Sequence, residues 1–130
     1  MEPVFRTLEI AARTAMRATG TRLTFHGLNN IPATGGAVMA INHTGYVDFL
    51  PAALAATARH RRMRFMIKAE MNDVRPVRFL IRHTGTIPVD RSAGAVSYAE
   101  AVRQLRAGEL VGVYPEATIS RSFELKEFKS

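Results

Sequence analysis

The chain has 130 residues, of which 47% are hydrophobic, and this length and composition favour one globular domain over a disordered chain. The net charge of +7 and the pI of about 10.8 favour anionic partners. Nucleic acid is disfavoured among them, because the arginines are scattered and the sequence has no zinc spacing, no RNA-binding aromatic signature and no helix-turn-helix. The lack of cysteine excludes disulfides and thiolate metal sites, and no apolar run approaches the roughly 20 residues of a membrane span.

Residues 4–19 predict an amphipathic helix that ends at Gly20. Its apolar side chains fall in one arc, and they are Val4, Phe5, Leu8, Ala11, Ala12, Ala15 and Met16. Arg6, Arg13 and Arg17 fall on the other side. This pattern fits a helix in the interface of an anionic membrane, and it equally fits a helix that packs on the domain with its arginines in water.

The rest of the chain alternates predicted strands with predicted helices. The strands are expected over residues 22–26, 37–41, 63–67, 86–89 and 110–114, and the helices over 48–58, 74–82 and 95–106. The strand over 37–41 is expected to be buried. The helix over 48–58 is expected to bury Phe49, Leu50, Ala53 and Leu54, and the helix over 95–106 to bury Val96, Ala99, Val102 and Leu105.

This alternation predicts an α/β fold: a single domain with a mostly parallel or mixed sheet flanked by helices, preceded by the N-terminal amphipathic helix. We expect the helix to occupy residues 1–20 and the domain residues 21–130. Ligands of such sheets collect beyond the carboxyl ends of the strands. His43, Lys68, Arg91 and Glu116 each stand near such an end, so topology alone predicts that they converge.

His43 and Asp48 are separated by four residues, where a predicted strand gives way to a helix. Imidazole is the side chain whose ordinary pKa lies nearest neutrality, and a carboxylate on its second nitrogen would fix the tautomer. The pair therefore suits a general base. The alternative is that His43 caps the helix and Asp48 is a solvated acid of its first turn. His26, His60 and His83 have no comparable context.

Two later segments accompany this pair, Thr84–Arg91 (TGTIPVDR) and Val113–Ser122 (VYPEATISRS). In this order and at this spacing, the three blocks resemble the phospholipid/glycerol acyltransferase family. Its His-x4-Asp and Gly-x-Ile-x-Val-x-Arg patterns match fully. The third pattern matches in part, because Tyr114, Ala117 and Ile119 replace the usual Phe, Gly and Arg.

The resemblance implies a glycerolphosphate acyltransferase-like fold and an O-acyltransferase that uses acyl-CoA or acyl-carrier protein as co-substrate. The acceptor would be a lysophospholipid or glycerol phosphate, and lysophosphatidate going to phosphatidate is the first candidate reaction. His43 would be the catalytic base and Asp48 its orienting carboxylate. The implied substrate-binding residues are Lys68, Arg91, Glu116, Gly85 and Thr118. A salt bridge with Asp90 is the alternative for Arg91, and a solvated lysine the alternative for Lys68.

No metal or tightly bound cofactor is implied by the resemblance. It implies a cytoplasmic protein that contacts the anionic inner face of the cell membrane peripherally, and it implies no nucleic acid partner. It also implies a longer protein with a fourth motif, so we expect the domain over residues 21–130 to be incomplete at its C-terminus. The alternative function is an inactive truncated remnant that only binds anionic lipid or phosphate.

Overall fold

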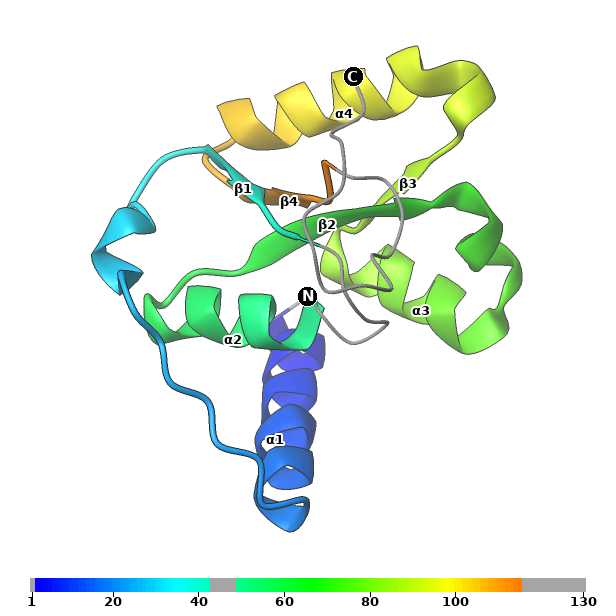
Figure 1. The fold of residues 1–130 in the computed structure, drawn as a ribbon. Helices are drawn as coiled ribbons and strands as arrows, with labels where there is room; N and C mark the ends of the chain where they lie inside the picture. The colour runs from blue at the N-terminus through cyan, green and yellow to red at the C-terminus, as the bar shows by residue number, and fades with distance from the viewer. Residues whose placement is uncertain (1, 43–48, 116–130) are drawn as a thin grey trace.

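Parallel strand pairing organises the part of the chain that the structure describes, residues 2–42 and 49–115 of a computed structural model (Figure 1). The helices are α1 (Glu2–Ala18), α2 (Phe49–Ala58), α3 (Arg75–Thr84) and α4 (Gly94–Arg106), with short 3-10 helices η1 (Leu28–Asn30), η2 (Ala69–Asp73) and η3 (Arg91–Ala93). The strands are β1 (Ala37–Ala40), β2 (Met63–Lys68), β3 (Ile87–Val89) and β4 (Leu110–Val113).

The four strands form one sheet in the order β1-β4-β2-β3, and every neighbouring pair is parallel. The predicted single α/β domain with an N-terminal helix is thereby confirmed, and its sheet is parallel rather than mixed over the described strands. Because all four strands run the same way, their carboxyl ends meet at one end of the sheet. We call this the carboxyl end of the sheet, and the opposite one the amino end.

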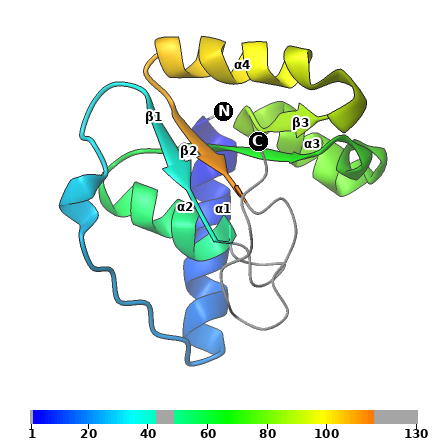
Figure 2. The ribbon, with the colours of Figure 1, turned by 45° about the horizontal axis from the view of Figure 1, so that its top comes forward.

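Helices cover both faces of the sheet. In Figures 1 and 2, α4 lies on one face, and α1, α2 and α3 lie on the other. Leu110 and Val111 of the central strand β4 are fully buried, and because side chains alternate along a strand they enter different clusters. The cluster around Leu110 includes Met63 and Ala56, whereas the cluster around Val111 includes Ile87 and Ala101.

Gly112 of β4 has no room for a side chain. A methyl group there would lie 2.6 Å from Sδ of Met63 and 3.1 Å from Cδ1 of Phe65. Both neighbours come from β2, which pairs with β4 in parallel, and Phe65 is the register partner of Gly112. The glycine therefore lets two large side chains of β2 cover the centre of the sheet.

The expected strand over residues 22–26 is absent, and residues 21–27 run without regular structure. Alternating apolar residues form a strand only where they pair, and residues 22–26 pair with no described strand, even though none occupies the outer edge of β1. The strand at 37–41 is also less buried than expected. Because β1 is an outer strand of the described sheet, Val38 is 56% exposed.

Two helices turn differently from the predicted orientation. In α2, Leu54 is buried as expected, but Ala56 is buried as well and Phe49 is exposed. In α4, Val96 is exposed, and Ser97 and Ala101 face the core. The hydroxyl of Ser97 donates to the carbonyl oxygen of Gly94 at 3.0 Å, which allows a serine to take a buried position.

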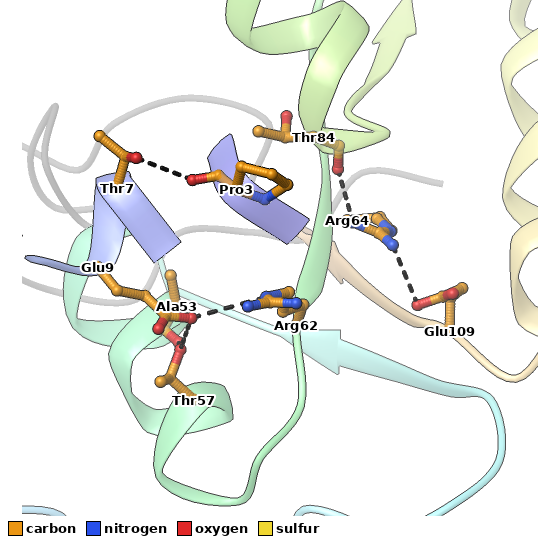
Figure 3. Close-up of polar contacts among 9 residues, drawn as sticks. All are labelled: Pro3, Thr7, Glu9, Ala53, Thr57, Arg62, Arg64, Thr84 and Glu109. Atoms are coloured by element: carbon orange, nitrogen blue, oxygen red, sulfur yellow. Dashed lines mark hydrogen bonds and ion pairs between the residues drawn. The ribbon is translucent and has the colours of Figure 1, made fainter. Parts of the chain in front are cut away.

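The N-terminal helix α1 packs on the domain through Phe5 and Glu9. The guanidinium groups of Arg62 and Arg64 each lie 4.9 Å from the centroid of the Phe5 ring. Glu9 lies 3.7 Å from Nε of Arg62 and accepts a hydrogen bond from Thr57 at 3.3 Å (Figure 3). This arrangement is what the packed-helix interpretation expects.

The three arginines that the sequence placed on the polar side of α1, Arg6, Arg13 and Arg17, are exposed. Leu8 and Ile10 of the same helix are exposed too. Within residues 2–42 and 49–115, no helix combines the length and the apolar character that crossing a bilayer requires.

Candidate active site

The strand ends converge as the topology predicts. Ala40, the last residue of β1, pairs with Val113, the last residue of β4. Lys68, the last residue of β2, pairs with Val89, the last residue of β3. Each of the three sequence blocks therefore follows or includes the last residue of a strand that ends at the carboxyl end of the sheet.

The pairing of Phe65 with Gly112 joins the two halves of the sheet. Continuing this register by one residue sets Met66 level with Val113, so β2 and β3 extend two residues beyond β1 and β4. With strands about 4.8 Å apart, β2 lies roughly 10 Å from β1, and β3 roughly 14 Å. This separation is the span over which one substrate would have to meet groups from both halves.

Four of the predicted site residues fall outside the described residues, and they are His43, Asp48, Glu116 and Thr118. What the structure describes is the chain that leads to them. The backbone N–H of Ile41 donates to the carbonyl oxygen of Val113 at 2.9 Å, which continues the β1–β4 ladder past its last paired residues. Asn42 follows and is exposed, and after β4 the description extends to Pro115.

Lys68 is the last residue of β2, at the carboxyl end of the sheet. It is exposed at the end of β2, and among the described residues it makes no hydrogen bond or ion pair. A lysine amine in this position is available to an anionic ligand. The same geometry is compatible with the solvated-lysine alternative, so Lys68 stays a prediction.

Asp90 and Ser92 shape the segment after β3. The backbone N–H and the hydroxyl of Ser92 donate to Oδ1 of Asp90, at 2.9 and 2.6 Å. These two hydrogen bonds hold the pKa of the Asp90 carboxyl below its ordinary value, because they stabilise the charged form. Arg91 begins η3 between these residues, and its side chain is not among those described. Sequence reasoning missed Ser92, although the Asp-x-Ser spacing is typical of such turns.

Gly85 has a structural role of its own. It ends α3 with φ of 67°, in the left-handed region that favours glycine. A methyl group at this position would lie 3.0 Å from Cδ and 3.1 Å from Nε of Arg64. The sequence prediction that Gly85 also contacts substrate is not tested by this geometry.

Arg64 is a buried arginine that sequence reasoning did not single out. Its guanidinium donates to the carbonyl oxygen of Thr84 at 2.9 Å and lies 3.5 Å from the carboxylate of Glu109 (Figure 3). The side chain thereby ties β2 to the end of α3 and to the start of β4. A charged residue inside an apolar strand pattern could have signalled this role, because such a charge is retained only when it is paired.

The basic connection between α2 and β2 also serves the fold. Arg61 donates to three carbonyl oxygens, those of Pro32 at 2.6 Å and of Gly35 and Gly108 at 2.8 Å. Nε of Arg59 donates to the carbonyl oxygen of Ile31 at 3.3 Å. These contacts lie at the amino end of the sheet, opposite the candidate site.

Two other features bear on ligands. Within the described part of the chain, no group of three or more histidine, aspartate or glutamate side chains could hold a metal ion. An open groove of about 770 Å³ lies between β3 and α4, lined by Ile87, Pro88 and Val96 among others. Of the predicted site residues whose side chains the structure describes, none lines this groove, so we do not assign it to the site.

Comparisons with known proteins identify the family. The family described as Acyltransferase matches residues 22–130. The chain is 30% identical over 90 residues to 1-acyl-sn-glycerol-3-phosphate acyltransferase of Bacillus subtilis (strain 168), which covers 68% of this chain and 44% of the relative. It is 33% identical over 100 residues to an uncharacterized protein of Mycobacterium leprae (strain TN), covering 73% and 25% respectively.

This chain thus spans less than half the length of these two curated relatives. No solved structure matches it. The family match nevertheless covers most of the chain and includes all three sequence blocks, so the resemblance stated above is confirmed. The chain belongs to the acyltransferase family.

Proposed function

We propose that this chain carries the reaction centre of an O-acyltransferase of glycerophospholipid synthesis. It would move a fatty acyl group from acyl-CoA or acyl-carrier protein to lysophosphatidate and so form phosphatidate. The observation that supports the proposal is the parallel sheet, because its four strands end at the same end of the sheet and the candidate site residues stand next to these strand ends in the sequence. The similarity to a bacterial protein named for this reaction supports the choice of acceptor.

His43 is the proposed base. It removes the proton from the acceptor hydroxyl while the oxygen attacks the thioester carbonyl, and Asp48 stabilises the imidazolium that forms. Collapse of the tetrahedral intermediate breaks the C–S bond, and His43 returns the proton to the leaving thiolate. A C–O bond replaces a C–S bond without an acyl-enzyme. No metal or tightly bound cofactor is needed, because the thioester is already activated.

Lys68 and Arg91 are the residues proposed to bind the phosphate of the acceptor. Lys68 ends β2 and Arg91 follows the adjacent strand β3, and both are basic residues suited to binding a phosphate. Holding the phosphate there positions the hydroxyl toward the β1 side, where His43 follows in the sequence, and such positioning lowers the barrier. We assign Glu116, Gly85 and Thr118 to the remaining contacts with the substrate.

We place this activity in the cytoplasm, at the inner face of the cell membrane, which the protein would contact peripherally. The exposed arginines of α1 support contact with an anionic surface, to which each basic residue contributes about 1 kcal/mol. No nucleic acid partner is proposed.

The acceptor assignment is tested by thiol release from acyl-CoA with three acceptors. These are lysophosphatidate, glycerol 3-phosphate and a monoacylglycerol without phosphate. We expect release to depend on acceptor and to be fastest with lysophosphatidate. Equal rates of thiol release with lysophosphatidate and with the phosphate-free acceptor would contradict the proposed phosphate-binding role of Lys68 and Arg91. Vesicle binding without any acceptor-dependent release would favour the remnant that only binds lipid.

A further inference from the structure

The segment that joins β2 to β3 exposes four large apolar side chains. Met71 of η2 is 42% exposed, Val74 before α3 46%, and Phe79 and Leu80 of α3 are 53% and 36% exposed. The opposite side of the same helix reaches the core through Ile81 and Thr84. Since α3 is therefore docked by one face, Phe79 on its outer face and Leu80 at the edge of its docked face are left exposed in the described structure.

Arginines flank the exposed apolar side chains of α3. Arg75 precedes Phe79 by four residues and Arg82 follows it by three, so the three share the outer face of α3. Both arginines are exposed, and the imidazole of His83 stacks on Phe79 at 4.1 Å between ring centroids. The helix contains no acidic residue. The nearest acids on the segment, Glu70 and Asp73, are confined to η2.

Arg78, by contrast, belongs to the fold. Its Nε donates to the carbonyl oxygen of Asn72 at 2.8 Å, which ties α3 to η2. The exposed arginines and the exposed apolar side chains are thus carried by a helix whose position on the domain is fixed. A fixed surface can orient the whole domain on whatever it contacts.

This surface begins beside the candidate site. Ala69, the first residue of η2, follows Lys68 directly, so Met71 and Val74 lie in the connection that leaves the carboxyl end of the sheet. Helix α3 then leads back toward β3 (Figure 1). A partner that contacts the outer face of η2–α3 therefore lies close to Lys68.

We propose that this surface, which consists of Met71, Val74, Arg75, Phe79, Leu80 and Arg82, rests on an anionic lipid bilayer and faces the carboxyl end of the sheet toward its lipid acceptor. Exposed apolar side chains on a segment whose helix carries exposed arginines and no acid match a bilayer that has an acyl interior and anionic headgroups. In α1, by contrast, Phe5 and Glu9 are used in docking the helix to the domain. The inference deepens the proposed function, since it names how a lipid acceptor reaches the site.

The test is co-sedimentation of the 130-residue chain with vesicles of phosphatidylcholine alone or mixed with phosphatidylglycerol. The variant is Met71→Ser with Phe79→Ser. The matched control is Val96→Ser with Tyr98→Ser, which changes two exposed side chains of α4 on the opposite face of the sheet. We expect the first variant to lose about tenfold or more in vesicle binding, given the transfer free energy of large apolar side chains, and the control to lose nothing.

Replacing Arg75 and Arg82 with Gln should weaken binding to the anionic vesicles and leave binding to phosphatidylcholine unchanged, because screened attraction is lost. Unchanged binding by the Met71→Ser/Phe79→Ser variant would overturn the inference. So would a dimer in the original chain that this variant converts to a monomer without changing vesicle binding, since that result would assign the surface to a second copy.

Turnover separates this inference from the proposed function. With a short-chain acceptor that stays monomeric in water, the Met71→Ser/Phe79→Ser variant should turn over at the rate of the original chain. With vesicle-embedded lysophosphatidate, its turnover rate should fall in proportion to its loss of vesicle binding. If the original chain turns over neither acceptor but the variant still loses vesicle binding, the proposed function fails and the membrane surface stands. If vesicle turnover survives the substitution, the surface is wrong and the reaction stands.

Discussion

At the amino end of the sheet, the guanidinium groups of Arg59 and Arg61 donate to backbone carbonyl oxygens, whereas at the carboxyl end Lys68 is exposed and makes no polar contact with the described residues. The first arrangement satisfies carbonyl groups of the connections that enter β1 and β4. The second leaves a charge available to a ligand. The basic residues behind the net charge of +7 therefore do not form one binding surface, because some of them stabilise the fold and others are available to a ligand.

Arg61→Gln should remove the side-chain hydrogen bonds that this residue makes at the amino end of the sheet, and it should have the largest effect on stability. Three carbonyl oxygens lose their charged donor, and we expect the free energy of unfolding to fall by about 2–4 kcal/mol. Urea denaturation measures the change, with Arg22→Gln in the exposed, irregular segment before η1 as the matched control. Because Arg61 is remote from the carboxyl end, the folded fraction should keep its KM for the acceptor. A raised KM with unchanged stability would assign Arg61 to substrate binding.

Arg91→Ala, at the carboxyl end, should impair binding of the acceptor and leave the stability of the fold nearly unchanged. We expect the KM for lysophosphatidate to rise about tenfold or more, because a charge-assisted contact with the phosphate is lost. The KM for acyl-CoA and the melting temperature should change little, since the replaced group contacts a part of the acceptor that does not react.

Lys68→Ala should give the same pattern with a smaller effect, since a lysine offers the phosphate a point charge instead of a fork. Steady-state kinetics with lysophosphatidate and with a phosphate-free acceptor show whether Lys68 and Arg91 bind the phosphate or have only a structural role. A lower melting temperature with unchanged kinetics would make either residue structural.

Ser92→Ala should give the smallest effect, confined to the pKa of Asp90. The hydrogen bonds from Ser92 lower that pKa, so their stabilisation is present above the ordinary carboxyl pKa and is lost as the pH falls through the lowered value. Removing the hydroxyl should raise the Asp90 pKa toward its ordinary value, because the serine hydroxyl is the larger cause of the shift. An NMR titration of the Asp90 carboxyl measures the change, and an unaltered titration would show that the backbone N–H is sufficient.

The sequence predicted the order and type of nearly every element from Ala37 onward, because each strand there finds a parallel partner and each helix a core to cover. It failed at Arg22–His26, because alternation alone does not decide whether a segment joins the sheet, and this segment pairs with no described strand. The exposed position of Val96 was missed for a similar reason, since periodicity gives an apolar arc but only packing decides which part of it is covered.

The candidate site was predicted in its location more fully than in its contacts. Sequence order and parallel topology bring Lys68 and the ends of β1, β3 and β4 to one end of the sheet. The sequence carries a local signal for Ser92 and for Arg64, the Asp-x-Ser spacing and a charge within an apolar strand, but their partners become clear only in the folded chain. The assignment of His43 and Asp48 rests on their motif and on the strand that precedes them.

The most direct test of the account is thiol release from acyl-CoA in the presence of lysophosphatidate, measured for His43→Ala beside His26→Ala. His26 lies exposed in the irregular segment before η1 and serves as a histidine control. The account predicts that His43→Ala lowers kcat by about a hundredfold or more, as expected for loss of a general base, while its melting temperature is retained and His26→Ala behaves like the original chain. A folded His43→Ala protein that keeps most of its acceptor-dependent turnover would contradict the proposed mechanism.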